Sequence, residues 1–206
     1  MKSKVIGWNI NQRSGMGKGI PQFVIDELID QNADIIVLTE LFQHSTIGYF
    51  WAEMERAGYQ HAVTQNDGTN EVGILWKKDV YTFLAVDDSV VTTMKNNHPN
   101  FLLVDLEDQN GQLLTVAGFR IRMVDYSQRA EELEIVVNKA KEKKNPVLMI
   151  ADCNNLRRRR RRQAGIYMWL TIFCPRVDSR DTRHAVKASL RNTQKEDMHM
   201  NLQKII

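Results

Sequence analysis

Cysteine and long apolar runs are both scarce in this sequence. Its 206 residues include two cysteines, Cys153 and Cys174, which match no metal-ligand spacing and form no disulfide framework. The longest apolar-rich stretch after the N-terminus, "AGIYMWLTIFC", is shorter than the about 20 residues that a membrane-spanning helix needs. The N-terminal "MKSKVIGWNI" lacks the apolar core and cleavage site of a signal peptide. We therefore expect a cytoplasmic protein without a membrane span.

The composition is that of one globular domain, with 43% hydrophobic and 26% charged residues and no internal repeat. We expect a monomer. The net charge of +3 is unevenly distributed, because residues 1–150 carry 15 basic and 20 acidic residues, whereas residues 151–206 carry 13 and 5. The run Arg157 to Arg162 supplies six of these cations. It could attract a polyanion such as nucleic acid, or form a solvated loop that repels itself open.

Apolar runs alternate with amphipathic segments over the first 150 residues. The runs predict strands at 4–10, 33–40, 61–65, 72–78, 101–108, 112–119 and 146–151. Asn110 and Gly111 form a dipeptide typical of a hairpin turn between two of them. Strands that alternate with helices and include a hairpin indicate an α/β domain with mixed sheets.

Helices are predicted after Pro21, around residues 45–58 and after Ser127, which is expected to cap the third. Helical spacing places these residues of the third helix on one face: Ala130, Leu133, Val136, Val137 and Ala140. After Asn155 little periodicity remains, so we expect a single domain, 1–206, in which 156–206 is an atypical, basic C-terminal segment.

Polar side chains stand at the ends of three apolar runs. Asn9 and Asn11 end "WNIN", Glu40 ends "DIIVLTE", and Asp152 and Asn154 follow "VLMIA". A carboxylate at the end of an apolar strand is costly to desolvate unless something neutralises it. Two carboxylates and several amide oxygens at one sheet edge would form an oxygen-only site, which suits Mg²⁺ or Mn²⁺ rather than zinc.

These three motifs together resemble the endonuclease/exonuclease/phosphatase superfamily, which includes exonuclease III, DNase I and the inositol-polyphosphate phosphatases. The resemblance covers residues 4–155. It implies a four-layer α/β sandwich in which two mixed β-sheets pack face to face with helices outside. It also implies metal-dependent hydrolysis of a phosphate ester, with Mg²⁺ or Mn²⁺ as the cofactor.

The resemblance also implies roles for the residues at the strand ends. Asn9 would lie beside the metal and the phosphate, and Glu40 would be the main metal ligand. Asn11 would occupy a second ligand position close to the substrate, where the family often has aspartate. Asp152 would orient or deprotonate the attacking water, and Asn154 would hold that aspartate or the phosphate oxygens.

The sequence also departs from the family pattern after the strand "LLTVAGF" and in the C-terminal part. Where the family often has His or Tyr after the strand "LLTVAGF", this chain has Arg120 and Arg122, which could bind the substrate phosphate or form salt bridges with the following Glu-rich helix. The family's C-terminal Ser-Asp-His motif is absent, so the C-terminal part is shortened or atypical. We predict His184, three residues after Asp181, as a displaced catalytic histidine.

The sequence therefore predicts a metal-dependent phosphodiesterase, and a nuclease in particular, acting on DNA rather than RNA. Only the basic C-terminal segment favours nucleic acid over a small phosphate ester. Two alternatives stay open. One is a catalytically impaired nucleic-acid-binding or regulatory protein on the same scaffold. The other is a phosphatase of a small phosphorylated metabolite or lipid.

Overall fold

The computed structural model describes residues 3–10, 19–42, 44–64, 71–87, 101–121, 126–152, 168–173 and 202–205. In chain order the elements are β1 (Val5–Asn9), α1 (Gln22–Gln31), β2 (Ile35–Leu41), α2 (Ile47–Arg56), β3 (Tyr59–Val63), β4 (Glu71–Lys77), β5 (Tyr81–Asp87), β6 (Phe101–Asp108), β7 (Leu113–Arg120), α3 (Tyr126–Lys141), β8 (Val147–Asp152), β9 (Met168–Phe173) and β10 (Leu202–Ile205). None of the helices in these ranges is long and apolar enough to cross a membrane.

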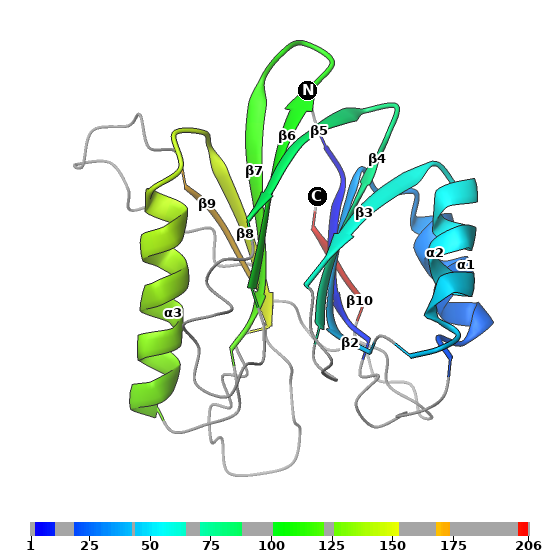
Figure 1. Cartoon of the computed structure of the whole chain (residues 1–206), viewed down its shortest axis with the longest axis horizontal. Coiled ribbons are helices and arrows are strands. Elements are labelled where there is room, and N and C mark those ends of the chain that lie inside the picture. The colour runs from blue at the N-terminus through cyan, green and yellow to red at the C-terminus, as the bar shows by residue number, and fades with distance from the viewer. Residues whose placement is uncertain are drawn as a thin grey trace.

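The strands form two five-stranded sheets that pack face to face. The first sheet has the order β10-β1-β2-β4-β3, and the second has the order β5-β6-β7-β8-β9. Each sheet is mixed, because β1 pairs with β2 and β7 with β8 in parallel, whereas the other pairs are antiparallel. Helices α1 and α2 cover the outer face of the first sheet, and α3 covers that of the second (Figure 1). The predicted four-layer sandwich is confirmed.

The core follows from the alternation of side chains along the strands. In β2, Ile35 and Val37 pack between the two sheets, whereas Ile36 and Leu38 pack under α1 and α2. A strand of this kind is buried on both faces, which explains its unbroken apolar sequence. A third cluster, which includes Val136 of α3, fills the space between that helix and the second sheet.

The two sheets approach most closely around Gly118 of β7. A Cβ atom at this glycine would lie 2.9 Å from Val37 Cγ1, 3.0 Å from Val72 Cγ1 and 3.1 Å from Ile74 Cγ1. All three neighbours belong to the inner face of the first sheet. The absence of a side chain at Gly118 therefore lets the sheets come together at this point.

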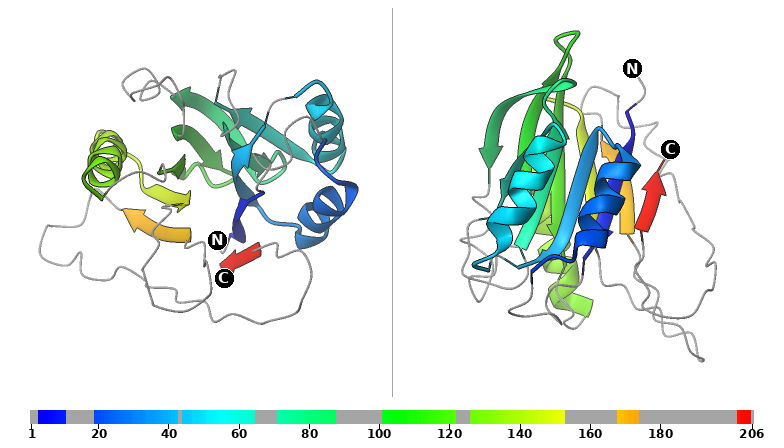
Figure 2. Two further views of the ribbon diagram at one scale, coloured as in Figure 1. Left: turned by 90° about the horizontal axis from the view of Figure 1, so that it is seen from below. Right: turned by 90° about the vertical axis from the view of Figure 1, so that its right-hand side faces the viewer.

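Most of the predicted elements are present, and the turn at Asn110–Gly111 is confirmed. Strands β6 and β7 pair across it, Gly111 has φ 74°, and the Gly111 N–H donates to Asp108 O at 2.9 Å. The strands that the sequence analysis did not predict are β5, β9 and β10. All three are edge strands with a single neighbour in their sheet. An edge strand needs no continuous apolar pattern, and Figure 2 shows β9 and β10 at the sheet margins.

The prediction for α3 is partly wrong. Ser127 lies inside the helix instead of capping it, and Ala130 and Leu133 are exposed. The buried face is formed by Glu132, Val136 and Ala140 at a spacing of four residues. Apolar periodicity alone could not show this face, because one of its members is a glutamate.

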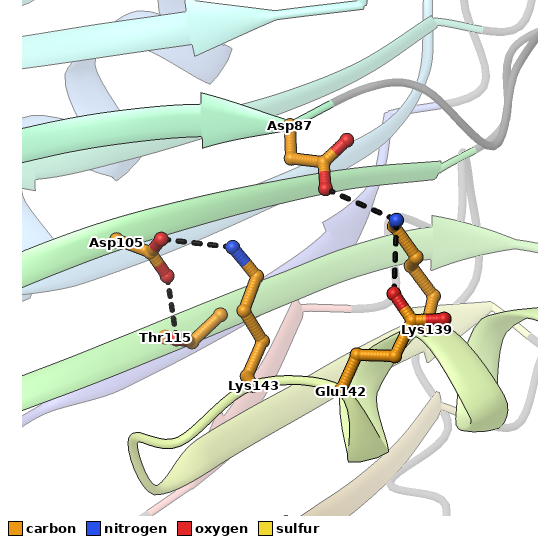
Figure 3. A network of polar contacts seen from close by, with 6 residues as sticks. All are labelled: Asp87, Asp105, Thr115, Lys139, Glu142 and Lys143. Atoms are coloured by element: carbon orange, nitrogen blue, oxygen red, sulfur yellow. Dashed lines mark hydrogen bonds and ion pairs between the residues drawn. The ribbon is translucent and has the colours of Figure 1, made fainter.

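Polar contacts fasten the C-terminal end of α3 to the second sheet (Figure 3). Lys143 Nζ lies 2.8 Å from Asp105 Oδ2 of β6, whose other oxygen accepts a 2.5 Å hydrogen bond from Thr115 Oγ1 of β7. Lys139 Nζ lies 3.7 Å from Asp87 Oδ2 of β5 and 3.0 Å from Glu142 Oε2. These pairs connect the end of the helix to β5 and β6, and Asp105 in turn joins β6 to β7.

Candidate active site at the carboxyl ends of four strands

Four polar side chains meet where the two parallel strand pairs end. Asn9 is the last residue of β1, Arg120 the last of β7 and Asp152 the last of β8, while Glu40 is the last but one of β2. In β1, β7 and β8 the alternation of side chains turns these residues toward the space between the sheets, as it does Val5, Val116 and Ile150 further back along the same strands. Each sheet thus contributes two of the four residues.

Glu40 reaches this space because β2 contains a β-bulge. Simple alternation would turn Glu40 to the helix-covered face with Ile36 and Leu38. Pairing with β4 shifts by one residue between Leu38 and Leu41, and Glu40 has φ 55°, in the left-handed region. The extra residue returns Leu41 to the helix side and directs Glu40 toward the second sheet. A non-glycine residue in this conformation costs about 1–3 kcal/mol and is typical of functional sites.

Arg120 forms a buried ion pair with Glu40 across the two sheets. Its Nη2 and Nε atoms lie 2.8 and 3.0 Å from Glu40 Oε1, and Nε lies 3.8 Å from Asp152 Oδ2. The exposed fractions are 4% for Arg120, 8% for Glu40 and 0% for Asp152. Of the two contacts that the sequence allowed for Arg120, a salt bridge with the following helix is wrong, because the guanidinium faces the carboxylates between the sheets.

Asn9 and Asp152 form the second link between the sheets. Asn9 Nδ2 donates a 2.7 Å hydrogen bond to Asp152 Oδ2, the oxygen that also faces Arg120 Nε. Beside them, the buried hydroxyl of Thr39 has no hydrogen-bond partner in the described part of the chain. Thr39 is the register partner of Asn9, and the sequence analysis passed over it although it interrupts the apolar run before Glu40.

The oxygen ligands available at this site fit a metal cation that keeps several of its bound waters. Glu40 can offer carboxylate oxygen, and Asn9, which donates through Nδ2, can offer its carbonyl oxygen. Mg²⁺ is commonly bound by one or two carboxylates, with waters and substrate phosphate completing its shell. Among the described residues no group of three or more His, Cys, Asp or Glu side chains could hold a metal ion, so an all-protein cage is absent from that part.

Other predicted site residues cannot be placed. Asn11, Arg122, Asn154 and His184 lie outside the described residues. One buried carboxylate that sequence reasoning missed is Glu71 at the start of β4, which accepts a hydrogen bond from the Thr64 hydroxyl. In the sequence it precedes an apolar run and has the appearance of a strand boundary. Glu71 lies two residues before Gly73, so its side chain is on the same, helix-covered face of β4, away from the four residues.

Comparisons with known proteins agree on the architecture. No protein-family model and no curated protein matches the sequence. Among solved structures, D. rerio TDP2 complexed with a single-strand DNA product is 18% identical, with a TM-score of 0.59 and coverage of 75% of this chain and 61% of that one. ANGEL2, described as a 2′,3′-cyclic phosphatase, is 14% identical, with a TM-score of 0.61 and coverage of 76% and 54%.

A third similar structure is an endonuclease/exonuclease/phosphatase from Bacteroides vulgatus, 17% identical, with a TM-score of 0.57 and coverage of 73% of this chain and 65% of that one. The chain thus spans less than two thirds of the length of these three proteins. Its two face-to-face mixed sheets between helices define a four-layer α/β sandwich. The chain has the fold of the endonuclease/exonuclease/phosphatase superfamily, as its three strand-end motifs indicated.

Proposed function

We propose that this protein is a divalent-metal-dependent phosphodiesterase and that its substrate is nucleic acid. The observation that carries the proposal is the convergence of Asn9, Glu40, Arg120 and Asp152 at one edge of the sandwich. Buried carboxylates, an amide and a guanidinium in contact suit the hydrolysis of a phosphate ester, which needs an activated water and stabilisation of negative charge on phosphoryl oxygens.

Each side chain has a distinct task in this mechanism. Asp152 orients the attacking water and accepts its proton, and the hydrogen bond from Asn9 Nδ2 fixes the rotation of that carboxylate. Arg120 donates to the non-bridging phosphoryl oxygens as their negative charge increases. Glu40 and Asn9 would hold Mg²⁺ or Mn²⁺, which when bound supplies Lewis-acid stabilisation of the same oxygens.

Two observations support nucleic acid, and DNA in particular, as the substrate. Residues 151–206 have an excess of eight positive charges, suited to a polyanion. The similar structure of D. rerio TDP2 contains a single-strand DNA product. The competing function is a catalytically impaired nucleic-acid-binding protein, favoured by the ion pair that engages Glu40 and by the missing Ser-Asp-His motif.

The test is cleavage of single-stranded, double-stranded and supercoiled DNA and of RNA in Mg²⁺, in Mn²⁺ and in chelator. We expect metal-dependent cleavage of DNA that the Glu40→Ala variant loses. Glu131→Ala is the matched control, because Glu131 is exposed on α3, and this variant should cleave like the wild type. Salt-sensitive binding without cleavage in any metal would instead establish the binding protein.

A further inference from the structure

Arg120 lies between two carboxylates of the buried cluster, where a positive charge is favourable. Two of its nitrogens lie within 3.0 Å of the same Glu40 oxygen, Oε1, and one of them is 3.8 Å from Asp152. The register of β7 and β8 places Arg120 directly beside Asp152, and the bulge in β2 brings Glu40 to it from the other sheet. The guanidinium is therefore a tethered counter-cation for both carboxylates.

The charges of these three buried residues constrain what else can bind. Glu40, Asp152 and Arg120 together carry a formal charge of −1. A divalent cation on Glu40 would change this to +1 and would place two cationic groups on one carboxylate. In a site this deeply buried, like charges at such separations repel strongly. A phosphodiester anion between the metal ion and the guanidinium would remove that repulsion.

We propose that Arg120 couples divalent-cation binding to phosphate binding, so that the metal ion binds weakly to the protein alone and more tightly with a phosphodiester anion. The inference rests on the proposed function and adds to it an order of binding set by one residue. Coupling is reciprocal, so the metal ion must strengthen anion binding by the same factor. Arg120 then acts twice, as a counter-ion for Glu40 in the metal-free protein and as a phosphate ligand in the complex.

Calorimetric titration with Mg²⁺ tests the proposal, with dimethyl phosphate as the anion because it is a simple, slowly hydrolysed diester. We expect dimethyl phosphate to tighten Mg²⁺ binding to the wild type by a factor of about 5–150, the usual range for coupled sites. Mg²⁺ alone should bind Arg120→Gln at least about tenfold more tightly than it binds the wild type, because the competing positive charge is absent. The effect of dimethyl phosphate should nearly disappear in that variant.

Two further variants keep the test decisive. Arg120→Lys retains the charge and should keep weak Mg²⁺ binding and the coupling, even if Arg120→Gln fails to fold. Arg56→Gln removes an exposed arginine that pairs with Glu53 on α2, and it should titrate like the wild type. A merely structural role for Arg120 would lower the melting temperature of its variants and leave the coupling factor unchanged.

The outcomes separate this inference from the proposed function. Equal Mg²⁺ affinity and equal coupling in the wild type and Arg120→Gln, with cleavage intact in the wild type, overturn the inference and leave the function standing. Equal behaviour of Arg120→Lys and Arg120→Gln also overturns it, since the charge would then have no effect. Absence of Mg²⁺ binding with and without the anion, together with absence of cleavage, overturns both.

Discussion

Replacement of Gly118 by alanine tests how closely the two sheets pack. The new Cβ would lie 2.9–3.1 Å from side-chain carbons of Val37, Val72 and Ile74, where ordinary contacts begin at about 3.4 Å. All three neighbours are branched side chains on β-strands, which cannot easily rotate away. Overpacking of this kind costs about 1–3 kcal/mol, which lowers the melting temperature of a chain this size by about 2–12 °C. Differential scanning calorimetry measures the shift.

Gly48→Ala is the matched control, since it adds the same methyl group where nothing lies within 4 Å. Gly48 lies in α2, so alanine there should stabilise the protein by up to about 1 kcal/mol. The double variant Gly118→Ala/Val37→Ala should be more stable than the sum of its two single changes predicts, because it removes the closest contact. A melting temperature of Gly118→Ala equal to or above that of the wild type would refute the close packing.

Three other predictions concern charge. In urea titrations without metal, the free energy of unfolding should fall by about 3–5 kcal/mol in Arg120→Gln and by less in Glu40→Gln, because only the former variant leaves two buried carboxylates without a cation. Burial raises the pKa of Tyr59 to about 12, so the stability that its neutral form contributes is complete below pH 10.0 and is lost as the pH rises toward 12. Over that window the urea midpoint of Tyr59→Phe should fall less than that of the wild type, and an equal fall would contradict this. Partial desolvation lowers the pKa of His61, whose ring stacks on that of Trp51 with centroids 3.9 Å apart, so acidification below 6.5 should destabilise the fold. NMR should show His61 titrating below 6.5, and Trp51→Ala should raise that pKa.

The sequence allowed much of the sandwich to be predicted, because its central strands are buried on both faces. An unbroken apolar run such as residues 35–38 indicates a central strand whatever its neighbours are. Edge strands have no such requirement, which is why β5 and β10 were missed, whereas the apolar run of β9 (Met168–Phe173) lies in the C-terminal part, where little periodicity remains. The inner face of α3 was missed for a different reason, since it includes Glu132.

Four of the residues named from the sequence meet in the structure, whereas their contacts with one another could not be predicted. The position of Asn9, Glu40 and Asp152 at strand ends predicted that they lie close together, because the carboxyl ends of parallel strands share one edge of a sheet. The pairing of Glu40 with Arg120 could not be predicted, since alternation places Glu40 on the opposite face of β2. Only the bulge, a feature of the pairing with β4, reverses that direction.

The division of the site between the two sheets has a consequence for how its chemistry depends on folding. Asn9 and Glu40 are delivered by residues 5–41, whereas Arg120 and Asp152 are delivered by residues 113–152. Neither group of strands holds all four residues by itself, so the polar cluster exists only after the sheets have docked. A substitution that loosens this docking, at Gly118 for example, would therefore separate the four residues while both sheets still retain their secondary structure. Loss of the proposed hydrolysis would then be the earliest sign that the sandwich has opened.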